Sequence, residues 1–194
     1  MMPFSDIDQL DEYISAHFPQ EISLRDGTEL TLAPMVPSVW PMMEEFVGAT
    51  PDEERKFFRH EASDPALVQR WCSELDYRHT LPLLAWHSDE VAADATLQRE
   101  AGIWTAHVGR MRLLVRPEFR RRGLGERMLH ETIKLAAELG LHKLVHECAA
   151  EQENLIGLLS ALGFHEAARL PDFIRDQHGA YHDMVLMIRE LENA

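Results

Sequence analysis

The chain has 194 residues, 45% of them hydrophobic, and a net charge of −14. This length and composition are typical of one globular domain that buries a full core without disulfide or metal staples. Two cysteines, no apolar run of membrane-spanning length and an acidic N-terminus predict a cytoplasmic protein, with no membrane as partner. The acidic balance argues against nucleic acid, whose binding depends on Lys and Arg, and favours a cationic, amine-bearing partner.

Organisation along the chain begins with a helix signal. A capping pattern from Ser5 to Asp8 predicts a first helix with one apolar face, ended by Pro19. Such a face usually packs on its own domain, although a partner surface is the alternative. We expect residues 1–22 to form an N-terminal helical extension and residues 23–194 a single domain, since no repeat or long linker divides them.

Hydrophobic periodicity and turn residues predict seven strands and five further helices after the first. In chain order these are a strand at Leu30–Pro34, helices at Ser38–Phe46, after Thr50-Pro51 and from Asp64-Pro65 to about Tyr77, a hairpin of Leu81–Trp86 and Val91–Leu97, a strand at Trp104–Val115, a helix at Glu126–Leu139, a strand at Leu141–Cys148, a helix at Gln152–Leu162, and strands at Phe164–Leu170 and Tyr181–Arg189.

A glycine-containing turn joins the strand that ends at Val115 to the helix that begins at Glu126. Its sequence is Arg120-Arg121-Arg122-Gly123-Leu124-Gly125. Glycines let backbone N–H groups approach an anion, and a helix N-terminus favours negative charge. Seven arginines and only two acidic residues lie between positions 110 and 127, a local charge of +5. A basic island on so acidic a chain predicts one specific polyanionic ligand.

Other phosphate-binding loops fit this turn poorly. No Lys-Ser/Thr pair follows the glycines, and Met128 replaces the third glycine of the dinucleotide fingerprint. The remaining pattern, Arg120-x-x-Gly123-x-Gly125, resembles the motif with which GCN5-related N-acetyltransferases (GNAT) bind the pyrophosphate of acetyl-CoA. A surface turn with solvated arginines is the alternative.

The resemblance extends from about Val91 to Phe164 and includes Val115-Arg116-Pro117 and Leu162-Gly163-Phe164. It implies an α/β (α+β) GNAT fold: a mixed, mostly antiparallel seven-stranded sheet flanked by helices, here with an extra N-terminal helix. It also implies acetyl-CoA as co-substrate, no metal, and a possible homodimer. Four short segments resemble the opening of bacterial protein-lysine acetyltransferase domains, including those that silence acetyl-CoA synthetase: Arg25-Asp26-Gly27-Thr28, Leu32-Ala33-Pro34, Glu53-Glu54-Arg55 and Phe57-Phe58-Arg59. They also resemble the openings of family members with no assigned substrate.

The resemblance implies which residues bind the coenzyme. The expected set comprises the strand residues Leu113, Leu114 and Val115, the turn and first helical residues Arg120, Arg121, Arg122, Gly123, Leu124, Gly125 and Glu126, and Gln152, where relatives often have a pantetheine-binding asparagine. A backbone N–H among residues 113–115 is expected to stabilise the tetrahedral oxyanion.

A base is required because an amine near neutral pH must lose a proton before it attacks the thioester. Many relatives carry a glutamate where this chain has Gly109 or Arg110. There are two catalytic candidates. His107 lies on the predicted strand face of Gly109, and its alternative role is that of an ordinary strand-edge histidine. Glu147 is favoured, because the lysine acetyltransferases have a glutamate at the corresponding place; its alternative role is a structural ion pair.

Many relatives use a tyrosine as the acid that protonates the departing coenzyme A thiolate, and this chain has Leu159 at that position. Packing in the core fully explains a leucine there. The thiolate then leaves unaided, or through water, or with help from a group such as Tyr181. The sequence therefore predicts an acetyl-CoA-dependent N-acetyltransferase acting on a protein lysine or on a small amine or amino acid. A non-catalytic acyl-CoA sensor and an interaction module that docks through its N-terminal helix are the alternatives.

Overall fold

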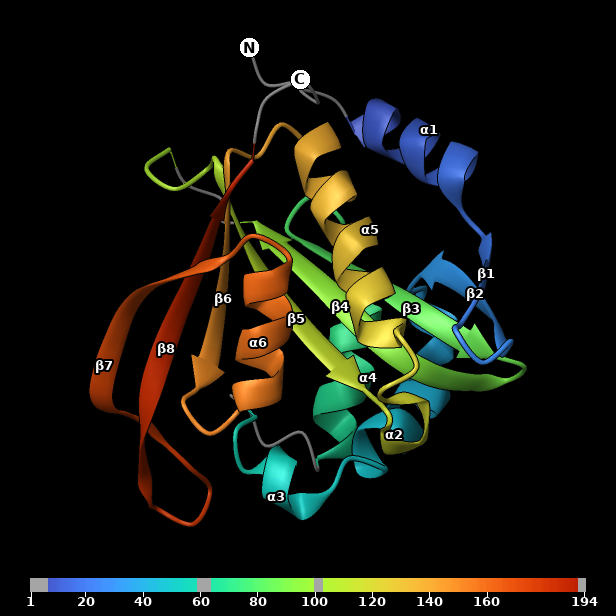
Figure 1. Cartoon of the computed structure of the whole chain (residues 1–194). Helices are drawn as coiled ribbons and strands as arrows, with labels where there is room; N and C mark the ends of the chain where they lie inside the picture. The colour runs from blue at the N-terminus through green and yellow to red at the C-terminus, as the bar shows by residue number, and fades with distance from the viewer. Residues whose placement is uncertain (1–6, 59–63, 100–102, 192–194) are drawn as a thin grey trace.

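The computed structural model describes residues 7–58, 64–99 and 103–191 (Figure 1). Helices and strands are interspersed along the chain. They are α1 (Ile7–His17), β1 (Gln20–Ser23), β2 (Glu29–Pro34), the 3-10 turn Pro37–Val39, α2 (Trp40–Gly48), α3 (Asp52–Arg55), α4 (Pro65–Ser73), β3 (Thr80–His87), β4 (Glu90–Arg99), β5 (Val108–Val115), the 3-10 turn Pro117–Phe119, α5 (Leu124–Glu138), β6 (Lys143–Ala149), α6 (Glu153–Ala161), β7 (His165–Arg175) and β8 (Tyr181–Glu190).

All the strands join one sheet in the order β1-β2-β3-β4-β5-β6-β8-β7. This is one strand more than the sequence predicted, and the extra strand is β1, which pairs antiparallel with β2. Only four residues long, β1 is too short for an alternating pattern to stand out, and β2 supplies the pairing that stabilises it. Residues 20–22, which the predicted extension covered, lie in this strand.

Every neighbouring pair of strands is antiparallel except β5 and β6, which run parallel. Their ladder extends only from Val108 opposite Lys143 to Arg110 opposite Val145. Both strands continue beyond it, to Val115 and to Ala149, and Figure 1 shows their ends diverging. We call the space between these diverging ends the β5–β6 gap.

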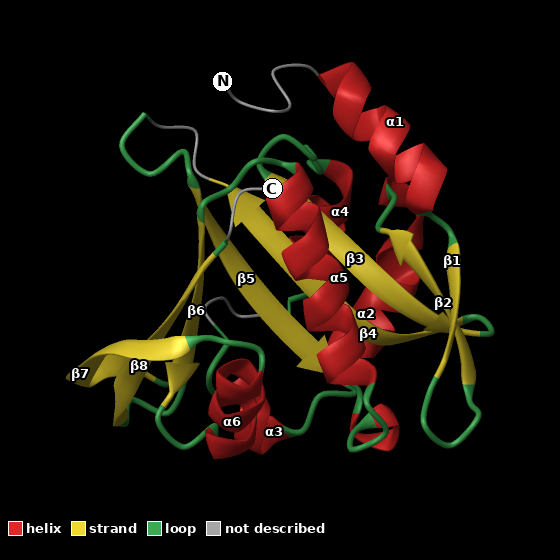
Figure 2. Ribbon diagram, turned by 45° about the horizontal axis from the view of Figure 1, so that its top comes forward, coloured by secondary structure: helices red, strands yellow, loops and turns green. Residues whose placement is uncertain are grey.

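Helices cover both faces of the sheet (Figures 1 and 2). On the first face α1, α5 and α6 bury residues such as Leu10, Leu129 and Leu159 against the strands, and on the second face α2 and α4 bury Phe46 and Val68. The apolar face of α1 therefore packs on its own domain, as expected, while Ser5 of the predicted cap lies outside the described residues. None of the described helices is long and apolar enough to cross a membrane.

Several element boundaries differ from the prediction, among them the end of β7, which lies at Arg175 instead of Leu170. β5 begins at Val108 instead of Trp104, because residues 103–107 form a turn in which the Trp104 side chain is 92% exposed. α4 ends at Ser73, about four residues early. α5 begins at Leu124, two residues before the predicted start, so the glycine turn leads directly into the helix.

Candidate functional site

The β5–β6 gap exposes backbone groups of β5. The Arg116 N–H donates to the Ala92 carbonyl at 2.9 Å, which fixes the alternation of the β4–β5 ladder. By that alternation the N–H of Leu114 is directed toward β4, whereas the N–H groups of Leu113 and Val115 are directed into the gap. Of the three strand residues expected to bind the coenzyme, two thus offer their amides to a ligand, and Leu114 uses its amide within the sheet.

The glycine turn ends at an uncapped helix N-terminus beside the gap. Gly123 is the N-cap of α5, with φ of +92°, and no side chain hydrogen-bonds to the first amides of the helix. Arg121 also has a positive φ, +59°. The unpaired amides of a first helical turn and the positive end of the helix dipole together favour an anion. The anion site predicted at Arg120–Gly125 therefore has the required backbone form.

A shallow depression on the surface lies at this helix N-terminus. Its lining consists of Ser23, Leu24, Arg25, Arg122, Gly123, Glu126, Arg127 and His130. Three arginines of the depression have carboxylate partners: Arg25 with Glu126 at 2.5 Å, Arg122 with Asp26 at 3.2 Å and Arg127 with Glu131 at 3.1 Å. The Glu126 side chain thus neutralises a cation, so its backbone amide is the part suited to bind an anion.

Arg120, the first residue of the motif, is directed away from this depression. Its Nε donates to the Val115 carbonyl at 2.8 Å, and its two terminal nitrogens pair with both carboxylate oxygens of Glu54. The guanidinium therefore joins the end of β5 to α3.

α5, β5 and α6 converge at Gly125. A side chain at this position would meet those of Leu113, Val115 and Leu158 at 3.4 to 3.6 Å. Gln152 lies at the start of α6, where its side-chain carbonyl accepts the Ala149 N–H at 2.9 Å and closes the β6–α6 turn. An extended ligand in the gap would thus be flanked by β5 on one side and by α6 on the other.

Glu147 lies on β6 beyond the end of the ladder, and its side chain is 17% exposed. Arg110 of β5 donates to its Oε1 at 2.7 Å. The ion pair that the sequence left as an alternative is thus present, and it spans the point where the two strands begin to separate. Cys148 packs in the core on the first face, so Glu147, one residue away along the strand, faces the second side of the sheet.

Comparison with known proteins decides the family. Residues 41–164 match the model of the Acetyltransferase (GNAT) family, which is more than half of the chain. The chain belongs to this family. Acetyl transfer from acetyl-CoA is therefore its general activity, and the GNAT expectation from the sequence is confirmed. A search of curated protein sequences found no match.

Solved structures share the fold of this acetyltransferase. The GNAT domain of S. lividans PAT aligns with a TM-score of 0.73 at 21% identity, covering 91% of this chain and 98% of that one. The Salmonella typhimurium protein yncA, solved with its cofactor acetyl-CoA, aligns at 0.72 and 18% identity over 85% and 95%. Ribosomal-protein-S5-alanine acetyltransferase from Vibrio fischeri aligns at 0.75 and 13% over 88% and 96%. At these identities the likeness shows the fold alone.

Position 109, one of the two places where many relatives carry a strand glutamate, is sterically crowded in this GNAT chain. Gly109 faces the core, and a Cβ there would come within 2.9 Å of the side chains of Leu97, Leu141 and Leu144. No larger side chain fits unless these leucines move.

His107, the other candidate base, lies in the exposed turn before β5, with its ring 6.1 Å from that of His142. It precedes the first residue of the β5–β6 ladder, whereas Glu147 follows the last. At about 3.3 Å per strand residue, roughly four residues of strand separate the two positions along the sheet. The structure does not bring the two candidates together.

Leu159 is fully buried in the core, which confirms packing as its role. Tyr181 lies at the start of β8 and is 62% exposed. This acetyltransferase thus has a leucine side chain at the position where many relatives have a tyrosine that serves as the acid.

Asp94 is an ionisable group that sequence reasoning missed. It lies on β4, opposite Leu114 of β5, and accepts a hydrogen bond from the Thr96 hydroxyl at 2.9 Å. Desolvation raises the pKa of Asp94 to about 6, against the opposing effects of Thr96 and the nearby Arg112. An acidic residue inside the otherwise apolar stretch Val91–Leu97 was the available signal. β5 stands between this carboxyl and the gap.

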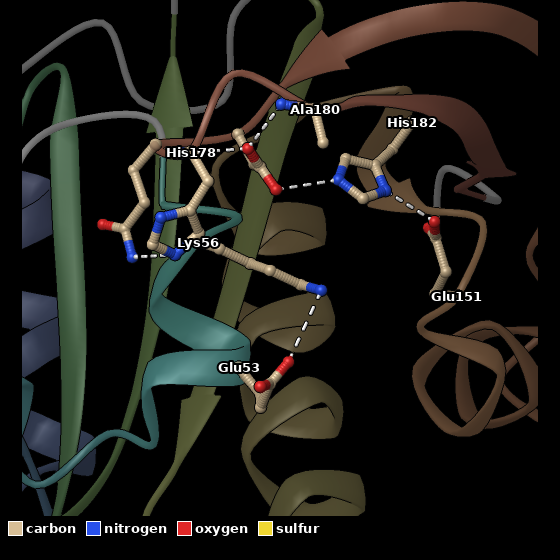
Figure 3. Close-up of polar contacts among 8 residues, drawn as sticks. Glu53, Lys56, Glu151, His178, Ala180 and His182 are labelled. Atoms are coloured by element: carbon tan, nitrogen blue, oxygen red, sulfur yellow. Dashed lines mark hydrogen bonds and ion pairs between the residues drawn. The ribbon is translucent and has the colours of Figure 1, made fainter.

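A histidine between two carboxylates lies just beyond the end of β6, on the β6 side of the gap (Figure 3). His182 of β8 places Nδ1 2.7 Å from Glu151 of the β6–α6 turn and Nε2 3.1 Å from Asp176 of the β7–β8 loop. The two hydrogen bonds, first that to Asp176, raise the pKa of His182, and the bonds to His182 lower the pKa of both acids. No three His, Cys, Asp or Glu side chains among the described residues are arranged to hold a metal ion.

This cluster should stabilise the fold most in mildly acidic solution. The His182 contribution is complete below its ordinary pKa of 6.5 and is lost as the pH rises through the raised value. The contributions of Asp176 and Glu151 are present above 3.8 and 4.5 and are lost as the pH falls. We expect His182→Gln to lower the thermal midpoint more at pH 6 than at pH 9. Equal losses at both pH values in melting curves would contradict a charged His182.

Proposed function

We propose that this protein transfers the acetyl group of acetyl-CoA directly to an amine nitrogen, without an acetylated enzyme intermediate. The observation that carries the proposal is the position of the gap, which opens beside the uncapped N-terminus of α5. An unpaired strand edge suits the amide-bearing pantetheine arm, and a helix N-terminus with glycines suits the pyrophosphate. Both lie at the C-terminal end of β5, so one extended molecule can occupy both.

In this proposal, the glycine turn and β5 bind different parts of acetyl-CoA. Backbone amides of Leu124, Gly125 and Glu126 bind the pyrophosphate, with Arg121, Arg122, Arg25 and Arg127 supplying positive charge. The amides of Leu113 and Val115 bind the pantetheine and the thioester oxygen. Gln152 holds the β6–α6 turn in place. Arg120 acts through its contacts with Val115 and Glu54 and does not contact phosphate.

The chemistry follows from these positions. Glu147 takes the proton from the acceptor ammonium, directly or through water, and the amine attacks the thioester carbon. A β5 amide stabilises the oxyanion of the tetrahedral intermediate. Collapse of the intermediate breaks the C–S bond and leaves an N-acetyl product. The thiolate needs little help, since a free thiol has a pKa of about 8.5, and Leu159 supplies no proton.

The proposed acceptor is a primary amine, either on a small molecule or amino acid or on a protein lysine. Thiol release from acetyl-CoA over a panel of amines, amino acids and lysine peptides tests this proposal and separates the two classes. Acetyl-CoA binding without thiol release across the panel would instead favour the sensor function. We also propose that the protein works in the cytoplasm, where the buried free thiols of Cys72 and Cys148 stay reduced.

Acetyl-CoA affinity should fall as the salt concentration rises. The coenzyme is polyanionic, and the arginines at its proposed site are partly exposed, so added ions screen their attraction. We expect the dissociation constant from calorimetry to rise about tenfold between 0.05 M and 0.5 M NaCl. An affinity that does not change with salt would mean that the arginines face elsewhere and that pantetheine contacts dominate.

A further inference from the structure

Residues 52–58 cross from the β5 side of the gap to the β6 side, and we call them the strap. The strap consists of the short helix α3 and the turn that follows it. Figure 1 shows α3 at the end of the sheet toward which β5 and β6 diverge. Two separate sets of contacts attach the strap, one on each side of the gap.

The first attachment is the Glu54–Arg120 pair. Both carboxylate oxygens of Glu54 are engaged, at 2.5 and 2.8 Å, and the same guanidinium holds the Val115 carbonyl. A bidentate arginine–carboxylate pair fixes orientation as well as distance. Arg120 itself begins the turn that leads to Gly123. The strap is thereby tied to the residues that would surround the coenzyme phosphates and to the end of β5.

The second attachment is at the histidine cluster of β8. The Phe57 ring meets the His182 ring edge-on, with centroids 5.1 Å apart. Lys56 lies close enough to Glu151 to lower the pKa of that carboxyl, after the larger effect of His182. Figure 3 shows the Lys56 side chain extending from the strap on the side of this cluster, with its amino group paired with Glu53. The attachment therefore joins the strap to the β6–α6 turn and to β8.

We propose that Glu54 is a positioning residue, and that through Arg120 it couples the strap to the coenzyme-binding turn. This inference rests on the proposed function. When acetyl-CoA binds, it fixes the turn that begins at Arg120 and thereby orders the strap across the open end of the gap, where the acceptor must approach. Because coupling between two sites is reciprocal, any contact that orders the strap raises the affinity for acetyl-CoA.

Hydrogen exchange of the strap, with acetyl-CoA as the probe, tests the coupling without an acceptor. The amides of Glu54, Arg55, Lys56, Phe57 and Phe58 donate to backbone carbonyls within and just before the strap. In the wild-type protein we expect them to exchange at least about fivefold more slowly when acetyl-CoA is saturating. Glu54→Gln should remove this protection, and Arg120→Lys should remove most of it, because lysine lacks the bidentate fork.

Glu53→Gln is the matched control. Glu53 lies on the same helix, loses the same charge, and is 90% exposed beside Lys56 at 3.6 Å. This variant should keep the wild-type protection. Calorimetry and melting curves on each variant show whether it is folded and binds acetyl-CoA.

The outcomes separate the two proposals. A wild-type protein that fails to bind acetyl-CoA overturns the proposed function and the coupling together. Binding without slower exchange in the strap overturns the coupling alone. Protection that persists in Glu54→Gln or is equally lost in Glu53→Gln also overturns it, because the effect would then not pass through Glu54.

Discussion

Gly123→Asp is expected to abolish measurable acetyl-CoA binding, a loss of at least about 100-fold in affinity, or about 2.7 kcal/mol. Gly123 has φ of +92°, which strains any L side chain, and a Cβ there would lie 3.3 Å from Nε of Arg25. The new carboxylate would also stand at the helix N-terminus, where the phosphates are proposed to bind. Calorimetry with acetyl-CoA measures the effect.

Gly179→Asp provides a matched control for this change. Gly179 has φ of +86°, and a Cβ there would lie 3.6 Å from Arg175, so both the backbone strain and a nearby arginine are reproduced. It lies in the β7–β8 loop, away from the glycine turn. The control should keep the wild-type affinity. An unchanged affinity in Gly123→Asp would place the phosphates elsewhere and remove the structural basis for the proposed coenzyme site.

Glu147→Gln is expected to lower kcat by about 10²–10⁴-fold and to leave acetyl-CoA affinity nearly intact. The amide keeps the size of the side chain but cannot accept the proton of the acceptor ammonium. Turnover against pH, with an active amine from the panel, measures the effect. His107→Gln, at the far end of the ladder, should keep both the rate and the pH profile. A wild-type rate in Glu147→Gln would mean that the ammonium loses its proton to bulk water or to another group.

Arg110→Met distinguishes a base from a purely structural ion pair. Removing the guanidinium, 2.7 Å from Glu147, takes away the charge that favours the carboxylate form. If Glu147 is the base, the acidic limb of the pH–rate profile should move to higher pH. A structural role predicts lower stability with the limb unmoved.

The sequence was most informative where function depends on backbone conformation. Glycines and a following helix predicted the turn at Gly123, because only a few residue types tolerate a positive φ. The β1 strand escaped prediction, since its four residues become a strand only through pairing with β2. Helix periodicity placed α5 correctly but missed its first two residues, one of them a glycine.

Side-chain partners were the part that no local pattern could supply. Glu54 meets Arg120 across 66 positions of the chain, and Arg110 meets Glu147 across 37. Such pairs are set by the strand order, which brings β5 beside β6 and α3 beside the end of β5. The motif thus identified Arg120 as important, whereas its contacts with Glu54 and Val115 appear only in the folded molecule.

The crowding at Gly109 affects the order in which substitutions could place a glutamate at that position. A glutamate at that position would require the ends of the Leu97, Leu141 and Leu144 side chains to shift, or smaller residues in their place, and each such replacement alone would leave a cavity where three strands meet. The effect of one substitution would therefore depend on which others came before it. The carboxylate of Glu147, on the neighbouring strand β6, requires no change in these three leucines.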